Sequence, residues 1–63
     1  MTYAEAIKLL RKKMLISQDE LAKAIDVSFA SVNRWEKDRY KPTIKSKRKL
    51  KIFLDEYDIK VDE

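Results

Sequence analysis

The 63-residue sequence contains no cysteine, no histidine and no glycine, and it has a single proline. The absence of cysteine and histidine excludes disulfides, thiolate or imidazole metal ligands, a nucleophilic thiol and the most common general acid or base. We therefore find no candidate for a catalytic residue, a metal ligand or a cofactor site, and no small-molecule ligand is evident. The protein is not expected to be an enzyme.

Long apolar runs are missing too, since the longest, such as "MLI" and "IFL", have three residues. A membrane-spanning helix needs about 20 apolar residues in succession. The N-terminal stretch "MTYAEAIKLLRKK" places its positive charge after its apolar residues, which is the reverse of a secretory signal. We therefore expect a soluble, cytoplasmic protein without a membrane partner, with one small domain spanning residues 1–63.

Charge is unevenly distributed along the chain, although the net charge is only +4. Residues 33 to 51 hold nine basic and two acidic side chains, whereas residues 55 to 63 hold one basic and five acidic side chains. A dense positive segment attracts polyanions, and phosphate backbones are the commonest biological polyanions. A solvated lysine face that only maintains solubility is the alternative. The acidic end is expected to avoid any polyanion that the middle binds.

Helix signals cover most of the chain, because apolar residues recur every three or four positions and glycine does not interrupt them. "TYAE" at residues 2–5 and "SQDE" at residues 17–20 are capping boxes, in which a hydroxyl and a glutamate satisfy free amides at a helix start. Ser28 is a third N-cap, and a last helix is expected to begin near Thr43, just after Pro42. The sequence therefore predicts an all-α protein.

Each predicted helix has an apolar stripe that can face a shared core. The stripes consist of Ala6, Ile7, Leu10 and Met14; Leu21, Ala22 and Ile25; Val32 and Trp35; and Leu50, Phe53, Leu54 and Tyr57. Beyond the last helix, "DIKVDE" alternates as a short strand would. Its Ile59 and Val61 either complete the core or meet a partner chain.

Residues 17 to 42, "SQDELAKAIDVSFASVNRWEKDRYKP", resemble the Cro/repressor (Xre-like) family of bacterial and phage DNA-binding domains. The pattern of that family runs S-Q-x-E-L-A, then G-V-S, then I/V-x-x-W-E-x-G and P. The flanking helices also fall where the family has them, so the resemblance covers about 55 of the 63 residues. It implies a compact four- to five-helix bundle that contains a helix-turn-helix, as in lambda-repressor-like DNA-binding domains.

Two positions depart from the family pattern. Asp26 and Asp38 stand where the family has glycine before and after the third helix. Aspartate tolerates the positive φ that these positions commonly require, at roughly 1 kcal/mol each. The fold should therefore form, although Asp38 brings a negative charge close to the expected path of the phosphates.

The resemblance also implies which residues bind DNA, because the N-terminal half of the third helix enters the major groove in this family. The implied base readers are Phe29, Ala30, Ser31, Asn33 and Arg34. Arg34 can donate to both O6 and N7 of guanine, and Asn33 can pair with adenine. Phe29 and Ala30 can pack against a thymine methyl group. The alternative for each is an ordinary surface residue and, for Phe29, a partly buried contact at the helix cap.

A second set of residues is implied to contact the DNA backbone or to brace the readers. This set comprises Gln18, Lys37, Arg39, Tyr40, Lys41 and Thr43. Arg11 and Glu36 match family positions that form an ion pair between the first helix and the end of the third. We therefore interpret these two residues as structural.

The first interpretation of function is sequence-specific binding of double-stranded DNA by a transcriptional regulator, with repression as the default role. The resemblance implies a homodimer on a palindromic site, associated with the nucleoid in the cytoplasm. The alternative is a protein-interaction module, such as an antitoxin or antirepressor, that binds an acidic protein with the same fold. Asn33 and Arg34 beside a continuous cationic path favour DNA.

Overall fold

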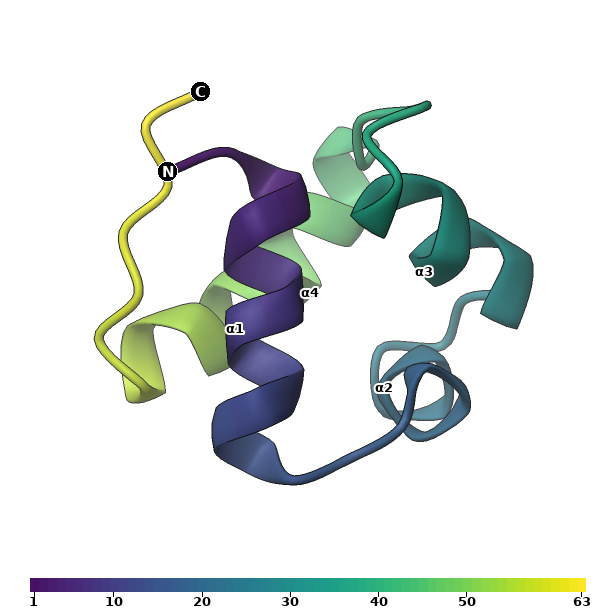
Figure 1. Ribbon diagram of the computed structural model, residues 1–63, viewed down its shortest axis with the longest axis horizontal. Helices are drawn as coiled ribbons and strands as arrows, with labels where there is room; N and C mark the ends of the chain where they lie inside the picture. The colour runs from purple at the N-terminus through teal and green to yellow at the C-terminus, as the bar shows by residue number, and fades with distance from the viewer.

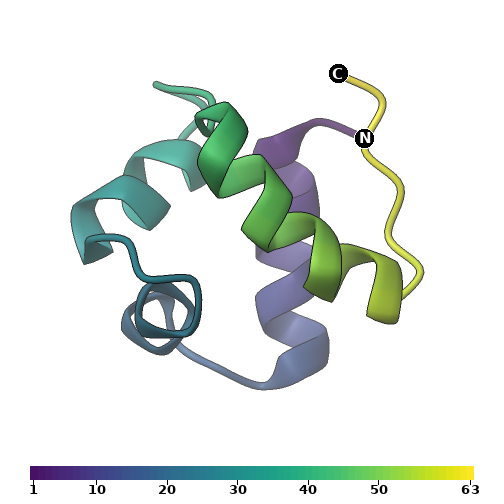
Figure 2. The same cartoon turned by 180° about the vertical axis from the view of Figure 1, so that it is seen from behind.

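The computed structural model describes residues 1–63 and contains four helices and no strand. The helices are α1 (Tyr3–Met14), α2 (Gln18–Ala24), α3 (Phe29–Glu36) and α4 (Ile44–Glu56). α4 crosses behind α1, while α2 and α3 lie on one side of α1 (Figures 1 and 2). The segment after α4 runs along the other side and returns to the N-terminus. The predicted all-α helix-turn-helix fold is therefore confirmed, with four helices.

All four helices begin at a hydroxyl residue that the sequence marked as a cap. The N-caps are Thr2, Ser17, Ser28 and Thr43, and each side-chain oxygen accepts a hydrogen bond from the amide three residues later. Both predicted capping boxes are complete, because Glu5 and Glu20 accept from the backbone amides of their caps. These bonds satisfy amides that have no partner inside the helix, and they fix where each helix starts.

All four helices also end in the same way, with a non-glycine residue in the left-handed conformation. These residues are Leu15 (φ 59°), Asp26 (φ 56°), Asp38 (φ 58°) and Asp58 (φ 56°). After each of them the next amide reaches back five residues, as when Val27 N–H donates to the carbonyl of Ala22 at 2.9 Å. This bond defines a Schellman motif. The expectation that Asp26 and Asp38 tolerate positive φ is confirmed.

The core is built from the predicted stripes and from one residue of the C-terminal segment. The fully buried side chains with the largest volumes are Ile7, Leu10, Leu21, Ile25, Leu50 and Val32. Ile59 is also buried and Val61 packs against the core, so the C-terminal segment completes the core of its own chain. The alternating pattern there does not form a strand, because no neighbouring strand is available to pair with it. None of the helices combines the length and apolar character that crossing a bilayer requires.

Replacing Leu15 with glycine should stabilise the protein. The Leu15 side chain is 89% exposed, so its loss removes no core contact, while glycine relieves the left-handed strain. We expect a gain of up to about 1 kcal/mol in the free energy of unfolding, measured by urea titration. Leu15→Ala is the matched control, because alanine keeps the Cβ atom that causes the strain. Equal stability of the two variants would contradict the expectation.

Candidate nucleic-acid interface

The third helix has an inner face that anchors it and an outer face that remains free. Val32 and Trp35 are buried in the core, and Glu36 is buried at the C-terminal end of the helix. On the outer face Phe29 is 51% exposed, and Arg34 is exposed one turn further on. Ala30 is exposed beside Phe29. The helix therefore presents its first turns to the outside, as the sequence predicted.

Glu36 is the centre of a hydrogen-bond network that joins three helices. Its carboxylate accepts from Nε of Arg11 at 2.5 Å and from Nη2 of Arg11 at 2.8 Å. The same carboxylate accepts from Nε2 of Gln18 at 3.0 Å. Gln18 in turn accepts, through Oε1, from Nδ2 of Asn33 at 3.2 Å. The expected ion pair between Arg11 and Glu36 is present. The hydrogen-bond network extends from it through Gln18 of α2 to Asn33 on the outer part of α3.

The network determines the charge state of Glu36. Burial alone would raise the pKa of this carboxyl, but the hydrogen bonds from Arg11 and Gln18 outweigh it and lower the pKa below its ordinary value of 4.5. The hydrogen bond with Glu36 likewise raises the pKa of Arg11. The ion pair therefore stabilises the fold fully above pH 4.5, and this contribution is lost as the pH falls through the lowered pKa of Glu36.

The network also braces Asn33. This half-buried side chain donates one hydrogen of its amide to Gln18, while its carbonyl oxygen accepts no hydrogen bond within the protein. An asparagine amide carries two hydrogens, so one donor and one acceptor stay free. Ser31 is more restricted, because its hydroxyl lies 2.9 Å from the hydroxyl of Ser28 and its amide donates to the same cap.

The loop from residue 37 to residue 43 leaves the end of α3 and carries most of the predicted backbone contacts (Figure 1). Lys37, Arg39 and Tyr40 are exposed in this loop. The Tyr40 ring lies against Arg34, with 5.7 Å between the guanidinium carbon and the ring centroid. Thr43 is the N-cap of α4, and its hydroxyl donates to Oγ of Ser46 at 3.2 Å. This contact uses the hydroxyl proton of Thr43, one of the residues that the resemblance assigned to the DNA backbone.

Lys41 is already paired with carboxylates of the protein itself. Its Nζ lies 2.6 Å from Oε2 of Glu63 and 3.1 Å from Oδ1 of Asp38. The hydrogen bonds that Lys41 donates to Glu63 and, with a smaller influence, to Asp38 raise the pKa of Lys41. The backbone amide of Tyr3 donates to Oε1 of Glu63 at 2.8 Å and holds the acidic side chain in place. Glu63 of the acidic segment thus pairs with one cation of the loop, although the two residues are far apart in sequence.

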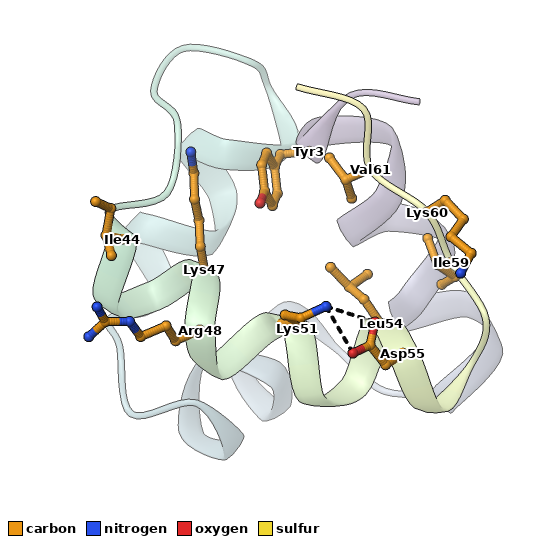
Figure 3. Close-up of a pocket in the computed structure, with 10 residues that line it drawn as sticks. All are labelled: Tyr3, Ile44, Lys47, Arg48, Lys51, Leu54, Asp55, Ile59, Lys60 and Val61. Atoms are coloured by element: carbon orange, nitrogen blue, oxygen red, sulfur yellow. Dashed lines mark hydrogen bonds and ion pairs between the residues drawn. The ribbon is translucent and has the colours of Figure 1, made fainter.

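A groove of about 350 Å³ lies elsewhere on the molecule, between α4, Tyr3 and the C-terminal segment (Figure 3). Its lining contains no residue of α2 or α3. In Figure 3, Tyr3 and Val61 lie along one rim, and Lys51 is paired with Asp55 on the opposite rim. The groove is therefore separate from the outer face of α3.

Three contacts of the candidate interface could not be read from sequence spacing. Gln18 bridges Glu36 and Asn33, Tyr40 lies against Arg34, and Glu63 pairs with Lys41. The first had a partial signal, because the resemblance implied that Gln18 braces a reading residue. The other two depend on where the loop and the C-terminal segment turn.

The comparisons with known proteins give one match. A family model described as helix-turn-helix matches residues 7–63, which include α1 from its fifth residue onward and the whole of α2, α3 and α4. No curated protein and no solved structure matches the chain. The matched range contains every residue that the sequence assigned to a DNA contact.

Arg11→Ala should destabilise the fold strongly at neutral pH, because it leaves the carboxylate of Glu36 buried without its cation. The loss can reach ~3 kcal/mol in the free energy of unfolding, measured by urea titration. The difference from the parent protein should shrink below pH 4.5 as the Glu36 carboxyl becomes protonated. Lys12→Ala, one residue further along α1 at an exposed position, is the control. Equal urea midpoints for Arg11→Ala and the parent at pH 7 would refute this role.

Proposed function

Because the chain belongs to the Cro/C1-type helix-turn-helix family of DNA-binding regulators, we propose that it is a sequence-specific repressor that reads the major groove with α3. The observation that carries the proposal is the division of α3 into a buried face and an outer face with Phe29, Ala30 and Arg34 exposed. An α-helix fits the major groove, and its first turns can then reach base edges.

The outer face offers chemistry suited to bases. An arginine fork matches O6 and N7 of guanine, and Arg34 forms no ion pair that would have to be broken first. Asn33 keeps a free donor and a free acceptor, the combination that pairs with adenine, and Gln18 limits its rotation. Phe29 supplies an apolar surface for a thymine methyl group. Ser31 is the weakest of the proposed readers, because its hydroxyl already lies against Ser28.

The loop after α3 supplies the proposed backbone anchors. Lys37 and Arg39 are exposed and can neutralise phosphates on either side of the groove. Lys41 can do the same once Glu63 and Asp38 release it, because a phosphate offers the same kind of acceptor as these carboxylates. Such contacts fix the register of α3 in the groove and do not depend on the base sequence.

We further propose that two copies bind a palindromic site and that bound protein represses by blocking access to a promoter. A single α3 reaches only a few base pairs, and a second copy would double the sequence that is read. The site of action is then the nucleoid, in the cytoplasm. Selection of random duplexes by the purified protein, followed by sequencing, tests specific recognition and the palindrome together.

One observation favours a second candidate, which is binding of an acidic protein by an antitoxin or antirepressor. Lys41 accommodates two carboxylates at once, and an acidic partner could supply the same groups. Competition with heparin separates the two functions, because a polyanion displaces phosphate contacts in proportion to their number. This candidate would be favoured if binding to an acidic protein persisted in the presence of heparin and the protein selected no duplex.

Reading and anchoring should respond differently to mutation. Arg34→Ala should weaken binding to the preferred duplex by ~1 to 3 kcal/mol and weaken binding to random duplex less, because a guanine contact exists only on the right base. Lys41→Ala should weaken both duplexes alike and reduce the slope of log affinity against log salt by about one. Titrations of both variants on both duplexes at several salt concentrations measure these effects. If Arg34→Ala leaves the ratio of preferred-duplex affinity to random-duplex affinity unchanged while Lys41→Ala abolishes it, the assignment of Arg34 as reader and Lys41 as anchor is wrong.

Glu63→Gln should strengthen binding to every duplex, since it removes the carboxylate that competes with phosphate for Lys41. We expect a rise in affinity of roughly two- to fivefold at low salt, and equal rises for preferred and random duplex. Glu56→Gln is the matched control, because Glu56 is also an exposed acid near the C-terminus but forms no ion pair. An equal rise for the control would attribute the effect to net charge alone.

A further inference from the structure

Arg34 is an exposed cation whose side chain has no carboxylate partner in the structure. Five of the fifteen lysine and arginine side chains lie within 4 Å of an acidic oxygen, and Arg34 is one of the ten that do not. The guanidinium of Arg34 instead lies over the ring of Tyr40, at 5.7 Å from the centroid. A long unpaired side chain loses rotational freedom when it binds, so a contact that orients it in advance favours binding.

Tyr40 reaches this position because of how α3 ends. Asp38 adopts the left-handed conformation, and the amide of Arg39 donates to the carbonyl of Arg34 at 3.1 Å. This turn directs the chain back along the helix, and the buried Pro42 holds the other end of the short loop. The backbone therefore places residue 40 beside residue 34, although the two are more than one helical turn apart in sequence.

The ring of Tyr40 is not needed for the core. It is 64% exposed and does not belong to the buried cluster or to the apolar side chains packed against it. Its contact with Arg34 uses the face of the ring, whereas a bond to a phosphate would use the hydroxyl. Replacing Tyr40 with phenylalanine removes the hydroxyl and keeps the ring, so mutation can separate the contact with Arg34 from a bond to a phosphate.

We propose that Tyr40 is a positioning residue for Arg34. Its ring holds the guanidinium by a cation–π contact in the orientation that matches the edge of a guanine. This inference rests on the proposed function, because it assigns Tyr40 to base specificity and not to the phosphate anchor. The planar guanidinium stacks on an aromatic face and still directs its N–H groups outward in the plane, so stacking and the guanine fork are compatible.

The test compares Tyr40→Leu with Tyr40→Phe on the preferred duplex and on random duplex at fixed salt. Tyr40→Leu should lower the specific-to-random affinity ratio roughly two- to fivefold, the range expected for an exposed cation–π contact. Tyr40→Leu should weaken the base preference at the same base-pair position as Arg34→Ala does. Tyr40→Phe should keep the ratio of the parent protein. In the Arg34→Ala background, Tyr40→Leu should have no further effect on the ratio.

A measurement without DNA examines the same contact in the free protein. The ring of Tyr40 should shift the NMR signals of the Arg34 side-chain methylene protons, and this shift should vanish in Tyr40→Leu and persist in Tyr40→Phe. Both variants should keep the urea midpoint of the parent, because the ring is mostly exposed. A ring-current shift that survives in Tyr40→Leu would overturn the proposed contact.

The outcomes of the binding test separate this inference from the proposed function. If Arg34→Ala lowers the ratio and Tyr40→Leu leaves it unchanged, Tyr40 does not position Arg34 and the inference alone is overturned. If Tyr40→Phe and Tyr40→Leu weaken both duplexes alike, the hydroxyl binds a phosphate and the inference is again overturned. If the parent protein prefers no duplex over random DNA, the proposed function fails and this inference fails with it.

Discussion

The carboxylate of Glu36 is the point at which α1, α2 and α3 are tied together. A charge that is only 6% exposed is strongly unfavourable unless donors surround it. The fold supplies them from two other helices, as Arg11 of α1 and Gln18 of α2. Moving α1 away would leave the charge without its cation, and moving α2 away would remove the hydrogen bond from Gln18. Glu36 therefore fixes the orientation of α3 more narrowly than apolar packing alone would.

This constraint connects the interior of the protein to its outer surface. The hydrogen bonds continue from Glu36 through Gln18 to Asn33, and the turn after Glu36 sets the position of Tyr40 beside Arg34. The orientation of two proposed readers thus depends on neighbouring side chains, that of Asn33 on Gln18 and that of Arg34 on Tyr40. In contrast, Lys41 is held by Glu63 and Asp38 at the surface, where salt and competing anions act on it directly. The proposed reading residues Asn33 and Arg34 are therefore oriented by neighbouring side chains, whereas the proposed anchor Lys41 is held by exchangeable charge pairs.

Much of the fold could be predicted from sequence because its determinants are local. The hydroxyl caps, the two capping boxes and the apolar stripes lie within one or two helical turns of the residues that they affect. The left-handed Leu15 carried no such signal, since leucine rarely adopts this conformation and only the meeting of α1 with α2 requires it. The alternation after α4 was misleading, because a strand needs a partner that the sequence of this segment does not reveal.

Residues of the candidate interface were assigned from the family pattern, while their partners depend on the three-dimensional path of the chain. The positions of Gln18, Asn33 and Arg34 follow from their place in the motif. The contacts of Tyr40 and Glu63 follow from the turn at Asp38 and from the return of the C-terminal segment to α1. Spacing along the chain does not encode these long-range turns, so the partners became evident only in the structure.

The left-handed helix ends have a consequence for the denatured ensemble. A chain without glycine samples fewer backbone conformations when it is unfolded, and it loses less entropy on folding than a chain with glycine at these four junctions. The strain of each junction is local to the folded state, whereas the restriction of the denatured chain extends to every residue. For a core as small as this one, stability thus depends on how little freedom the unfolded chain has as well as on what the folded chain buries.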